Sequence, residues 1–332
     1  MSAIWVSTLL TALAVGETLA QTASKPAPVS AACVELYHAA MTHIANGQLN
    51  EAEIAVSAAL AEGVNHAQDS CAGLVLNNMA AFMSVSGRPA DAERLAERAV
   101  VILEKTYSPN GLELLRPLQT LAASRLEQGE TAKAREAFKK IQAIRIQRSE
   151  DKALIHGIAA ALSQAEGNLA GAEIEYLASL RAWDEAGRGE TAEAGAVLNG
   201  LGVVYMHEQR LAEARQAFDR ALAIFSRAKD AVAVDRIKVL QCRGALHALE
   251  GDWGQAEQDF HEAVSIADQE LWIDPGALRS ILTNYAYVLR KNHHGRQARP
   301  VEARAAGIHL DHAPSTIIDV TELLPKGKSA RK

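Results

Sequence analysis

The sequence repeats itself with a period of about 42 residues. With Ala214 as the reference, six alanines occupy equivalent places at intervals of 38 to 42 residues: Ala52, Ala92, Ala134, Ala172, Ala256 and Ala298. A turn residue stands five positions before each alanine, namely Gly47, Gly87, Gly129, Gly167, Gln209, Gly251 and His293. Periods of this size are typical of arrays whose units bury their apolar faces only against neighbouring units.

Each repeat contains two apolar stripes with helical spacing, one on either side of the turn residue. In the fifth copy the stripe after the turn consists of Ala214, Phe218, Ala221 and Phe225, and the stripe before it of Leu198, Leu201, Gly202 and Tyr205. Small residues recur where the two stripes meet: Ala80, Ala122, Ala160, Gly202, Gly244 and Ala286. Small side chains allow close helix packing, and we expect Gly202 to face Ala214 across the turn.

These patterns predict an all-α fold, an α-solenoid of about seven stacked helix-turn-helix units over residues 31–307. The expected helix pairs are 31–45 with 50–62, 70–86 with 90–106, 112–127 with 131–148, 151–166 with 169–186, 191–208 with 211–227, 231–250 with 253–270, and a seventh pair that Asp274 opens. Asp69 or Ser70 is the expected N-cap of the helix over 70–86. In the last helix Pro300 cannot donate its backbone N–H, so a late start or a kink is expected there.

The two ends of the chain lie outside the repeats. Residues 1–20 combine an apolar run with small residues at its end, which indicates a cleaved signal peptide, and residues 21–30 indicate a proline-containing linker. No Lys or Arg precedes the apolar run, so a short membrane anchor and a cytosolic helix are the alternatives. We therefore expect export to the periplasm or the medium if the signal is real, with no membrane span after cleavage, and a cytoplasmic location otherwise.

The C-terminal tail, residues 308–332, ends in a basic stretch and contains a short apolar segment, residues 316–324. That segment could cover the end of the array. The whole chain has a formal charge of -6 and a sequence pI near 6.0, which is unfavourable for binding nucleic acid.

The residue pattern in the fifth copy resembles the tetratricopeptide repeat, and the resemblance covers about residues 31–307. It rests on Leu198, Gly202, Tyr205, Ala214, Phe218 and Ala221. The 42-residue period and the motifs LNNMA (from Leu76) and LTNYA (from Leu282) resemble the longer variant found in kinesin light chains. This resemblance implies a right-handed superhelix whose first helices line a concave groove for a peptide or protein partner.

In such a groove an asparagine amide can bind a peptide backbone, because it offers both a donor and an acceptor. The resemblance places eight candidate partner-binding residues on the first helices: Asn77, Asn78, Arg116, Gln119, Asn199, Lys238, Gln241 and Asn284. The alternative is that the asparagines bond to a neighbouring helix and only hold the array together. The sequence indicates neither the partner nor the oligomeric state.

Two of the three cysteines, Cys33 and Cys71, open the first helices of successive predicted units. Stacking of these units would bring the two helix ends together, so an exported chain could form a Cys33–Cys71 disulfide. Alternatively, all three cysteines are small packing residues.

No motif for a cofactor, a metal or catalysis stands out. The segment KGKS, from Lys326, lacks the earlier glycine and the preceding strand of a phosphate-binding loop. The cysteines lack the spacing of a zinc site. His293 with His294, and His309 with His312, could bind a metal, but exposed surface histidines are far commoner. We therefore expect a non-enzymatic interaction scaffold without a cofactor or metal. The alternative is an enzyme, or an enzyme subunit, whose site the sequence does not reveal.

Overall fold

A computed structural model describes residues 35, 38–40, 42–43, 51–52, 54–55, 66–85, 88–227, 233–269 and 273–309, and for 66–71 and 85 the backbone only. The predicted signal peptide, the linker, most of the first repeat and the tail from residue 310 lie outside this set. So do Cys33 and the side chain of Cys71, and their disulfide therefore stays a prediction.

The described residues form helices without a strand, which confirms the all-α prediction. A short 3-10 helix, η1 (Leu112–Leu114), precedes α6. The α-helices are α4 (His66–Val85), α5 (Pro89–Thr106), α6 (Leu115–Glu127), α7 (Thr131–Gln142), α8 (Ser149–Ala165), α9 (Leu169–Glu185), α10 (Ala192–His207), α11 (Leu211–Arg227), α12 (Ala233–Leu249), α13 (Trp253–Ala267), α14 (Pro275–Lys291) and α15 (Gly295–Ala306). None of these helices is both long enough and apolar enough to cross a membrane.

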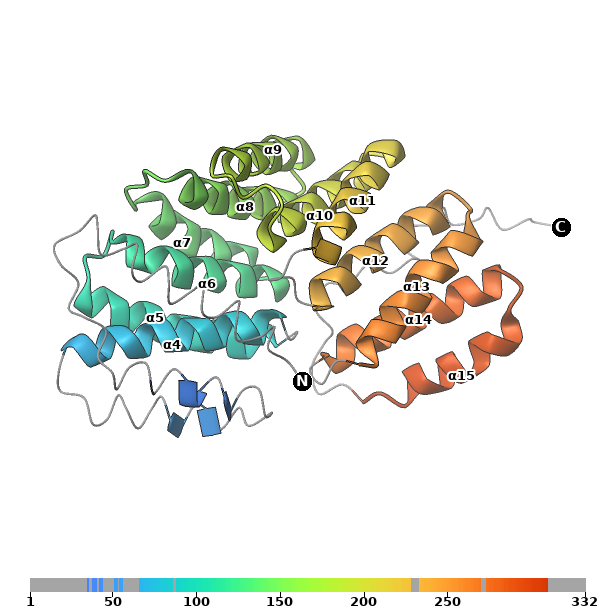
Figure 1. Ribbon diagram of the computed structural model, residues 1–332, viewed down its shortest axis with the longest axis horizontal. Helices are drawn as coiled ribbons and strands as arrows, with labels where there is room; N and C mark the ends of the chain where they lie inside the picture. Colours follow the sequence, from blue (N-terminus) through green and yellow to red (C-terminus); the bar gives the residue numbers. More distant parts are fainter. Residues whose placement is uncertain are drawn as a thin grey trace. The chain divides into compact units, whose positions relative to one another are not determined.

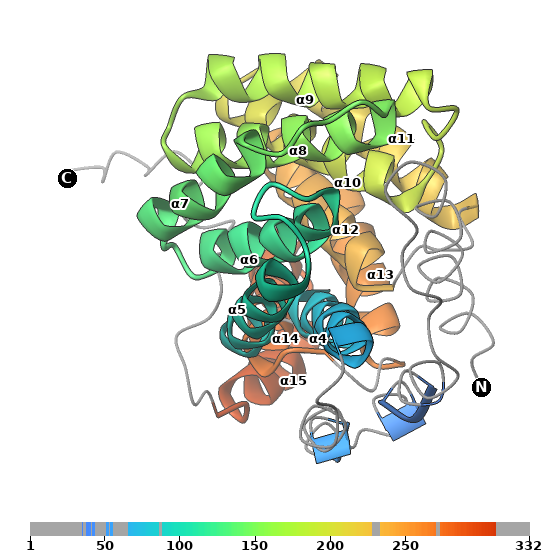
Figure 2. The same cartoon turned by 90° about the vertical axis from the view of Figure 1, so that its left-hand side faces the viewer.

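The chain divides into two compact units, the first with residues 1–84, 88–126 and 130–158 and the second with the rest. In the first unit α4 and α5 lie side by side in Figure 1 and in Figure 2. In the second unit each helix from α10 to α14 packs on the next, and α10 also contacts α9 and α12. Figure 1 shows the succession from α12 to α15 in orange and red. Adjacent helices thus pack in pairs, as predicted for stacked helix-turn-helix units.

Glycines on the first helices make room for aromatic rings from the second helices. A Cβ atom built on Gly202 would lie 2.5 Å from Cε1 of Phe218, and one on Gly244 would lie 2.8 Å from Cε2 of Phe260. Phe218 and Phe260 are fully buried. Gly202 therefore faces a ring one helical turn beyond Ala214, whereas the sequence pattern suggested Ala214 itself. The ring needs the space that a side chain on Gly202 would occupy.

The turn has one geometry in the five repeats whose turn residue the structure describes, whatever residue occupies it. The turn residue has positive φ at Gly129, Gly167 and Gly251, and also at Gln209 (61°) and His293 (64°). In the fifth repeat the Arg210 N–H donates to the Tyr205 carbonyl at 2.9 Å, the long hydrogen bond of a Schellman helix end. Such an end requires a left-handed residue, so Gln209 and His293 adopt a conformation that favours glycine.

Replacing Gln209 by glycine is expected to stabilise the protein by about 0.5 to 1 kcal/mol. Left-handed backbone costs an L-residue about 1 to 2 kcal/mol, and the greater freedom of unfolded glycine offsets about half of that. The matched change Gly251→Ala should destabilise it by about 1 kcal/mol. Urea unfolding measures the change in the free energy of unfolding for each variant. If the two changes had the same sign, this explanation of the turn would be contradicted.

Ion pairs join successive repeats at the residue that follows the reference alanine. In the first unit Glu93 accepts from Arg125 Nε at 2.8 Å, and in the second Glu173 accepts from Arg210 Nη1 at 2.8 Å. Two carboxylate oxygens of Glu257 lie 2.8 and 3.0 Å from Nδ1 of His294. Each of these links spans 32 to 37 residues of sequence. The polar residues beside the turns therefore help to fix the stacking register.

Arg210 is the most connected of these groups. Its guanidinium also bonds Glu213 and Glu208 and lies 4.1 Å from the ring centroid of Tyr205. These hydrogen bonds lower the pKa of Glu173 and Glu213 below the usual 4.5.

The pH dependence of stability should report on this cluster. Lowered carboxyl pKa values stabilise the fold above about pH 4.5, and this contribution is lost as pH falls through the folded-state values. Arg210→Gln should therefore destabilise the protein at neutral pH and progressively less below about pH 4.5. Urea unfolding at several pH values measures this cost. The exposed Arg181, changed to Gln, is the control, and a pH-independent cost at Arg210 would refute the assignment.

Several predicted boundaries need correction. Helix α4 begins at His66, so Asp69 and Ser70 lie inside the helix and neither caps it. Helix α7 ends at Gln142, six residues before the predicted 148. Helix α15 begins directly after the turn and includes Pro300, so the expected late start is wrong. Pro300 is exposed and lies in the second turn of α15.

Candidate functional site

The first helices present two rows of residues, three and six positions before the small residue at the helix contact. In the second unit the row at three positions, here called the amide row, comprises Asn199 on α10, Gln241 on α12 and Thr283 on α14. The outer row, at six positions, comprises Ala196, Lys238 and Ser280 on the same helices. Because residues three apart share a helix face, the two rows form one surface on each helix.

Exposure differs along these rows. Ala196, Lys238 and Thr283 are exposed, whereas Gln241 is only 7% exposed. Asn199 is half-buried, and its Oδ1 atom is buried without a hydrogen-bond partner. A buried amide oxygen without a partner costs about 1 to 3 kcal/mol. A hydrogen-bond donor that reached Oδ1 of Asn199 after a small side-chain movement would recover this free energy.

Burial raises the pKa values of two groups on α12 that lie close to this surface. It raises the pKa of Asp235, in the first turn of α12, and the nearby Lys238 ammonium partly offsets this rise. Burial also raises the pKa of Cys242 to about 12, so this free thiol stays protonated and acts as an apolar side chain. Lys238 is the exposed cationic residue of the outer row on α12, and its Nζ lies 3.9 Å from Oε1 of Glu127.

In the first unit the amide row comprises Asn77 on α4 and Gln119 on α6, and Arg116 occupies the outer row. Asn77 is 8% exposed, and its Oδ1 accepts from Thr120 Oγ1 on α6 at 3.1 Å. This amide therefore bonds a neighbouring helix, the alternative that the sequence left open. Arg116 is exposed and Gln119 half-buried, so these two remain accessible.

The two remaining candidates stand one position later than the amide row. Asn78 is half-buried, and Asn284 is 2% exposed in the place that Gly200 holds on α10. Asn284 lies in the packed interior of α14, so its amide reaches a ligand only if α14 moves. Arg116 and Lys238, in contrast, occupy equivalent exposed positions, one in each unit.

Sequence reasoning missed Ala196, Ser280 and Thr283, which complete the two rows in the second unit. Their chemistry gave no signal, because they are neither amides nor charged. Constant spacing from Gly202, Gly244 and Ala286 would have identified them. In the described part of the chain no group of three or more His, Cys, Asp or Glu residues could hold a metal ion.

A family model of the tetratricopeptide repeat matches residues 72–147 and 193–269. No functionally curated protein matches the sequence. Solved structures do match, among them a Rap protein complexed with competence and sporulation factor, at 15% identity and a TM-score of 0.56, covering 82% of this chain and 73% of that one.

A tetratricopeptide repeat protein from Parabacteroides merdae matches at 16% identity with a TM-score of 0.51, covering 89% of this chain and 98% of that one. TPR-like repeats of kinesin light chain type from Podosopora anserina match at 14% identity with a TM-score of 0.36, covering 70% and 92%. The two structures with TM-scores above 0.5 show the fold alone. The family match indicates a protein-interaction scaffold built from stacked helix pairs. The resemblance found in the sequence is confirmed: residues 72–147 and 193–269 of this chain are tetratricopeptide repeats.

Proposed function

We propose that this protein binds an extended peptide segment of a partner protein across the first helices of its second unit. The binding surface is formed by the amide row, Asn199, Gln241 and Thr283, and the outer row, Ala196, Lys238 and Ser280. The observation that carries the proposal is the buried Oδ1 atom of Asn199 on α10, which has no hydrogen-bond partner. The exposed Ala196 lies on the same helix face, and the exposed Lys238 lies on α12, which contacts α10.

Each component of this surface suits a peptide. Ala196 is small and exposed, so it leaves room for a backbone to approach, and the amide oxygen of Asn199 can accept from a peptide N–H group. Lys238 provides a positive charge one helical turn from Gln241, so it favours a peptide that carries a carboxylate. In the first unit Arg116 and Gln119 repeat this combination on α6.

Site-specific photo-cross-linking tests the proposal in the native cell. A photoreactive amino acid at Ala196 or Thr283 should give one dominant adduct, identified by mass spectrometry. The matched control is Gln258, an equally exposed residue on the second helix α13. If Gln258 gives the same adduct in the same yield, or if Ala196 and Thr283 give none, the first helices are not the binding surface.

A charge substitution tests the same surface by measuring how strongly the partner is captured. Lys238→Glu reverses the proposed attraction for a carboxylate and should weaken capture of the cross-linked partner about tenfold. Arg220→Glu, on the second helix α11, makes the same change in net charge away from the surface. Equal weakening by both variants would indicate a general charge effect.

We further propose that the protein is exported, on the basis of the apolar run within residues 1–20. N-terminal sequencing of the natively expressed protein should then begin near Gln21. A cytosolic protein that retains Met1 would overturn export, together with the oxidising environment that a Cys33–Cys71 disulfide requires.

A further inference from the structure

The first and the last repeat of the array carry opposite charges. Residues 31–87, up to the turn of the second repeat, contain no Lys or Arg and five acidic residues: Glu35, Glu51, Glu53, Glu62 and Asp69. Residues 274–307, the last repeat, contain two acidic residues, Asp274 and Glu302, and six basic ones: Arg279, Arg290, Lys291, Arg296, Arg299 and Arg304. The formal charges of these two stretches are therefore -5 and +4.

The flanking segments do not cancel this contrast. Residues 1–30 contain one acidic and one basic residue, Glu17 and Lys25. Residues 308–332 contain three acidic and four basic residues: Asp311, Asp319, Glu322, Lys326, Lys328, Arg331 and Lys332. Their formal charges of 0 and +1 leave the first repeat acidic and the last repeat basic.

Only part of the positive charge of the last repeat is balanced inside the array. Arg290 donates to Glu302 through Nε at 2.5 Å and Nη2 at 2.6 Å, and Arg304 Nη1 donates to Asp268 on α13 at 3.1 Å. Four exposed basic side chains make no ion pair with a described residue: Arg279, Lys291, Arg296 and Arg299. Arg296 and Arg299 stand three residues apart on α15, so they lie on one face of this helix.

Two carboxylates of the first repeat are also without a cation. Glu35 and Glu51 are exposed, and neither makes an ion pair within the part of the chain that the structure describes. Another stretch without Lys or Arg, residues 244–273, contains seven acidic residues. Five of these contact an arginine or histidine side chain elsewhere in the array: Glu250, Glu257, Asp259, Glu262 and Asp268. Unpaired carboxylates therefore distinguish the first repeat from this second acidic stretch.

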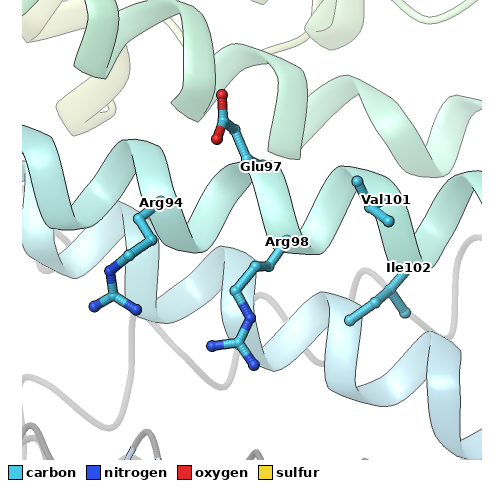
Figure 3. Close-up of a pocket in the computed structure, with 5 residues that line it drawn as sticks. All are labelled: Arg94, Glu97, Arg98, Val101 and Ile102. Atoms are coloured by element: carbon cyan, nitrogen blue, oxygen red, sulfur yellow. The ribbon is translucent and has the colours of Figure 1, made fainter.

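Helix α5 also presents arginines, but together with carboxylates. Arg94 and Arg98 project from α5 beside a hollow that Glu97 also lines (Figure 3). Arg94 Nη2 lies 3.4 Å from Oδ1 of Asp91, and Glu97 accepts from Arg125 at 2.5 Å. Charges of both signs are thus mixed on α5, whereas Arg296 and Arg299 form a basic face.

We propose that copies of this chain associate head to tail, with the basic face of α15 against the acidic first repeat of the next copy. The exposed, unpaired Arg296 and Arg299 complement the exposed, unpaired Glu35 and Glu51. Because every copy carries both charges, the same contact can recur from copy to copy, and such a heterologous contact closes into a ring or continues as a filament. This association is separate from the peptide surface on the first helices of the second unit.

The sign of the salt effect tests this association. Copies with a formal charge of -6 repel one another if their charge acts as a whole, and low salt then keeps them apart. Complementary ends instead attract at low salt, and the screening length falls from about 30 Å at 10 mM salt to about 3 Å at 1 M. In sedimentation-velocity runs on the purified protein, the mean sedimentation coefficient should rise with protein concentration at low salt. This rise should vanish at high salt.

Charge reversal identifies the residues in contact. The variant Arg296→Glu with Arg299→Glu has two acidic ends, so at low salt it should stay monomeric. The variant Glu35→Lys with Glu51→Lys has two basic ends and should also stay monomeric. An equal mixture of the two variants restores complementary ends and should assemble. A single chain with all four substitutions keeps the original net charge with exchanged ends, so it should assemble as the unchanged protein does.

A matched control separates the position of the charges from their sum. Lys139→Glu with Arg181→Glu makes the same change in net charge as the α15 variant, on exposed positions of α7 and α9, and should still assemble. A failure of the four-substitution chain to assemble would overturn the proposal, as would equal loss of assembly in this control. An unchanged protein that is monomeric at every concentration in low salt would overturn it too, and would leave the basic face to an acidic partner other than this chain.

Discussion

Replacing Arg243 by leucine is expected to lower the free energy of unfolding by about 3 kcal/mol. Arg243 on α12 donates to Asp259 on α13 through Nε at 3.0 Å and Nη2 at 2.6 Å, and to Asp219 on α11 at 2.7 Å. Asp259 is 4% exposed. The leucine would leave this buried carboxylate without its guanidinium partner, with His247 Nε2 at 3.8 Å. Removing one partner of a buried ion pair is strongly destabilising.

The preceding repeat supplies the matched rescue. At the positions of Arg243 and Asp259 it has Leu201 and Ala217, both buried. The double variant Arg243→Leu with Asp259→Ala copies that apolar pair, so most of the lost stability should return. Urea unfolding of the two single variants and the double variant measures the coupling. Additive losses would mean that the pair does not act as a unit.

Replacing Gly202 by leucine is expected to destabilise the protein by about 1 to 3 kcal/mol. Even a Cβ atom at this position would lie 2.5 Å from the fully buried ring of Phe218, so the ring or the helix must move. Thermal unfolding and the urea midpoint measure the effect. The loss should be largest in the repeat that contains α10 and α11, because each unit is stabilised mainly by its neighbours.

Gly254 offers the control for this substitution. It is a helical glycine on the exposed face of α13, and the nearest atom to a Cβ at this position would be Asp252 Oδ1 at 3.7 Å. Gly254→Leu should therefore be neutral or stabilise by up to about 1 kcal/mol through helix propensity. If both leucines had the same effect, close packing at Gly202 would not be the reason for its glycine.

The fold was predictable from the sequence because residues that pack in the same way recur at the same place in each repeat. The turn residue at Gln209 could be identified even without glycine, since the period places it, and positive φ at this residue confirms the assignment. The small residue at Gly202 was also predictable, but its contact was not. A stripe with period 3.6 specifies the face of a helix, whereas the choice between Ala214 and Phe218 depends on how far the two helices are shifted.

The candidate site was less predictable, because an amide looks the same whether it faces a ligand or a neighbouring helix. Asn77 bonds Thr120, which lies 43 residues away in the sequence, and this pairing depends on the stacking of α4 and α6. On α14 the amide-row residue Thr283 is exposed, whereas Asn284, one residue later, is 2% exposed. A shift of one residue turns a helical side chain by about 100°. The exposure of Ile174 and Leu177 on α9 likewise emerges only when burial is compared between repeats.

Hydrogen–deuterium exchange of the protein with and without its cross-linked partner tests the central claim most directly. If the first helices of the second unit bind a peptide, amide protection should rise in peptides from α10, α12 and α14 and stay unchanged in α11 and α13. Protection confined to the second helices, with α10, α12 and α14 unaffected, would contradict the proposed binding surface.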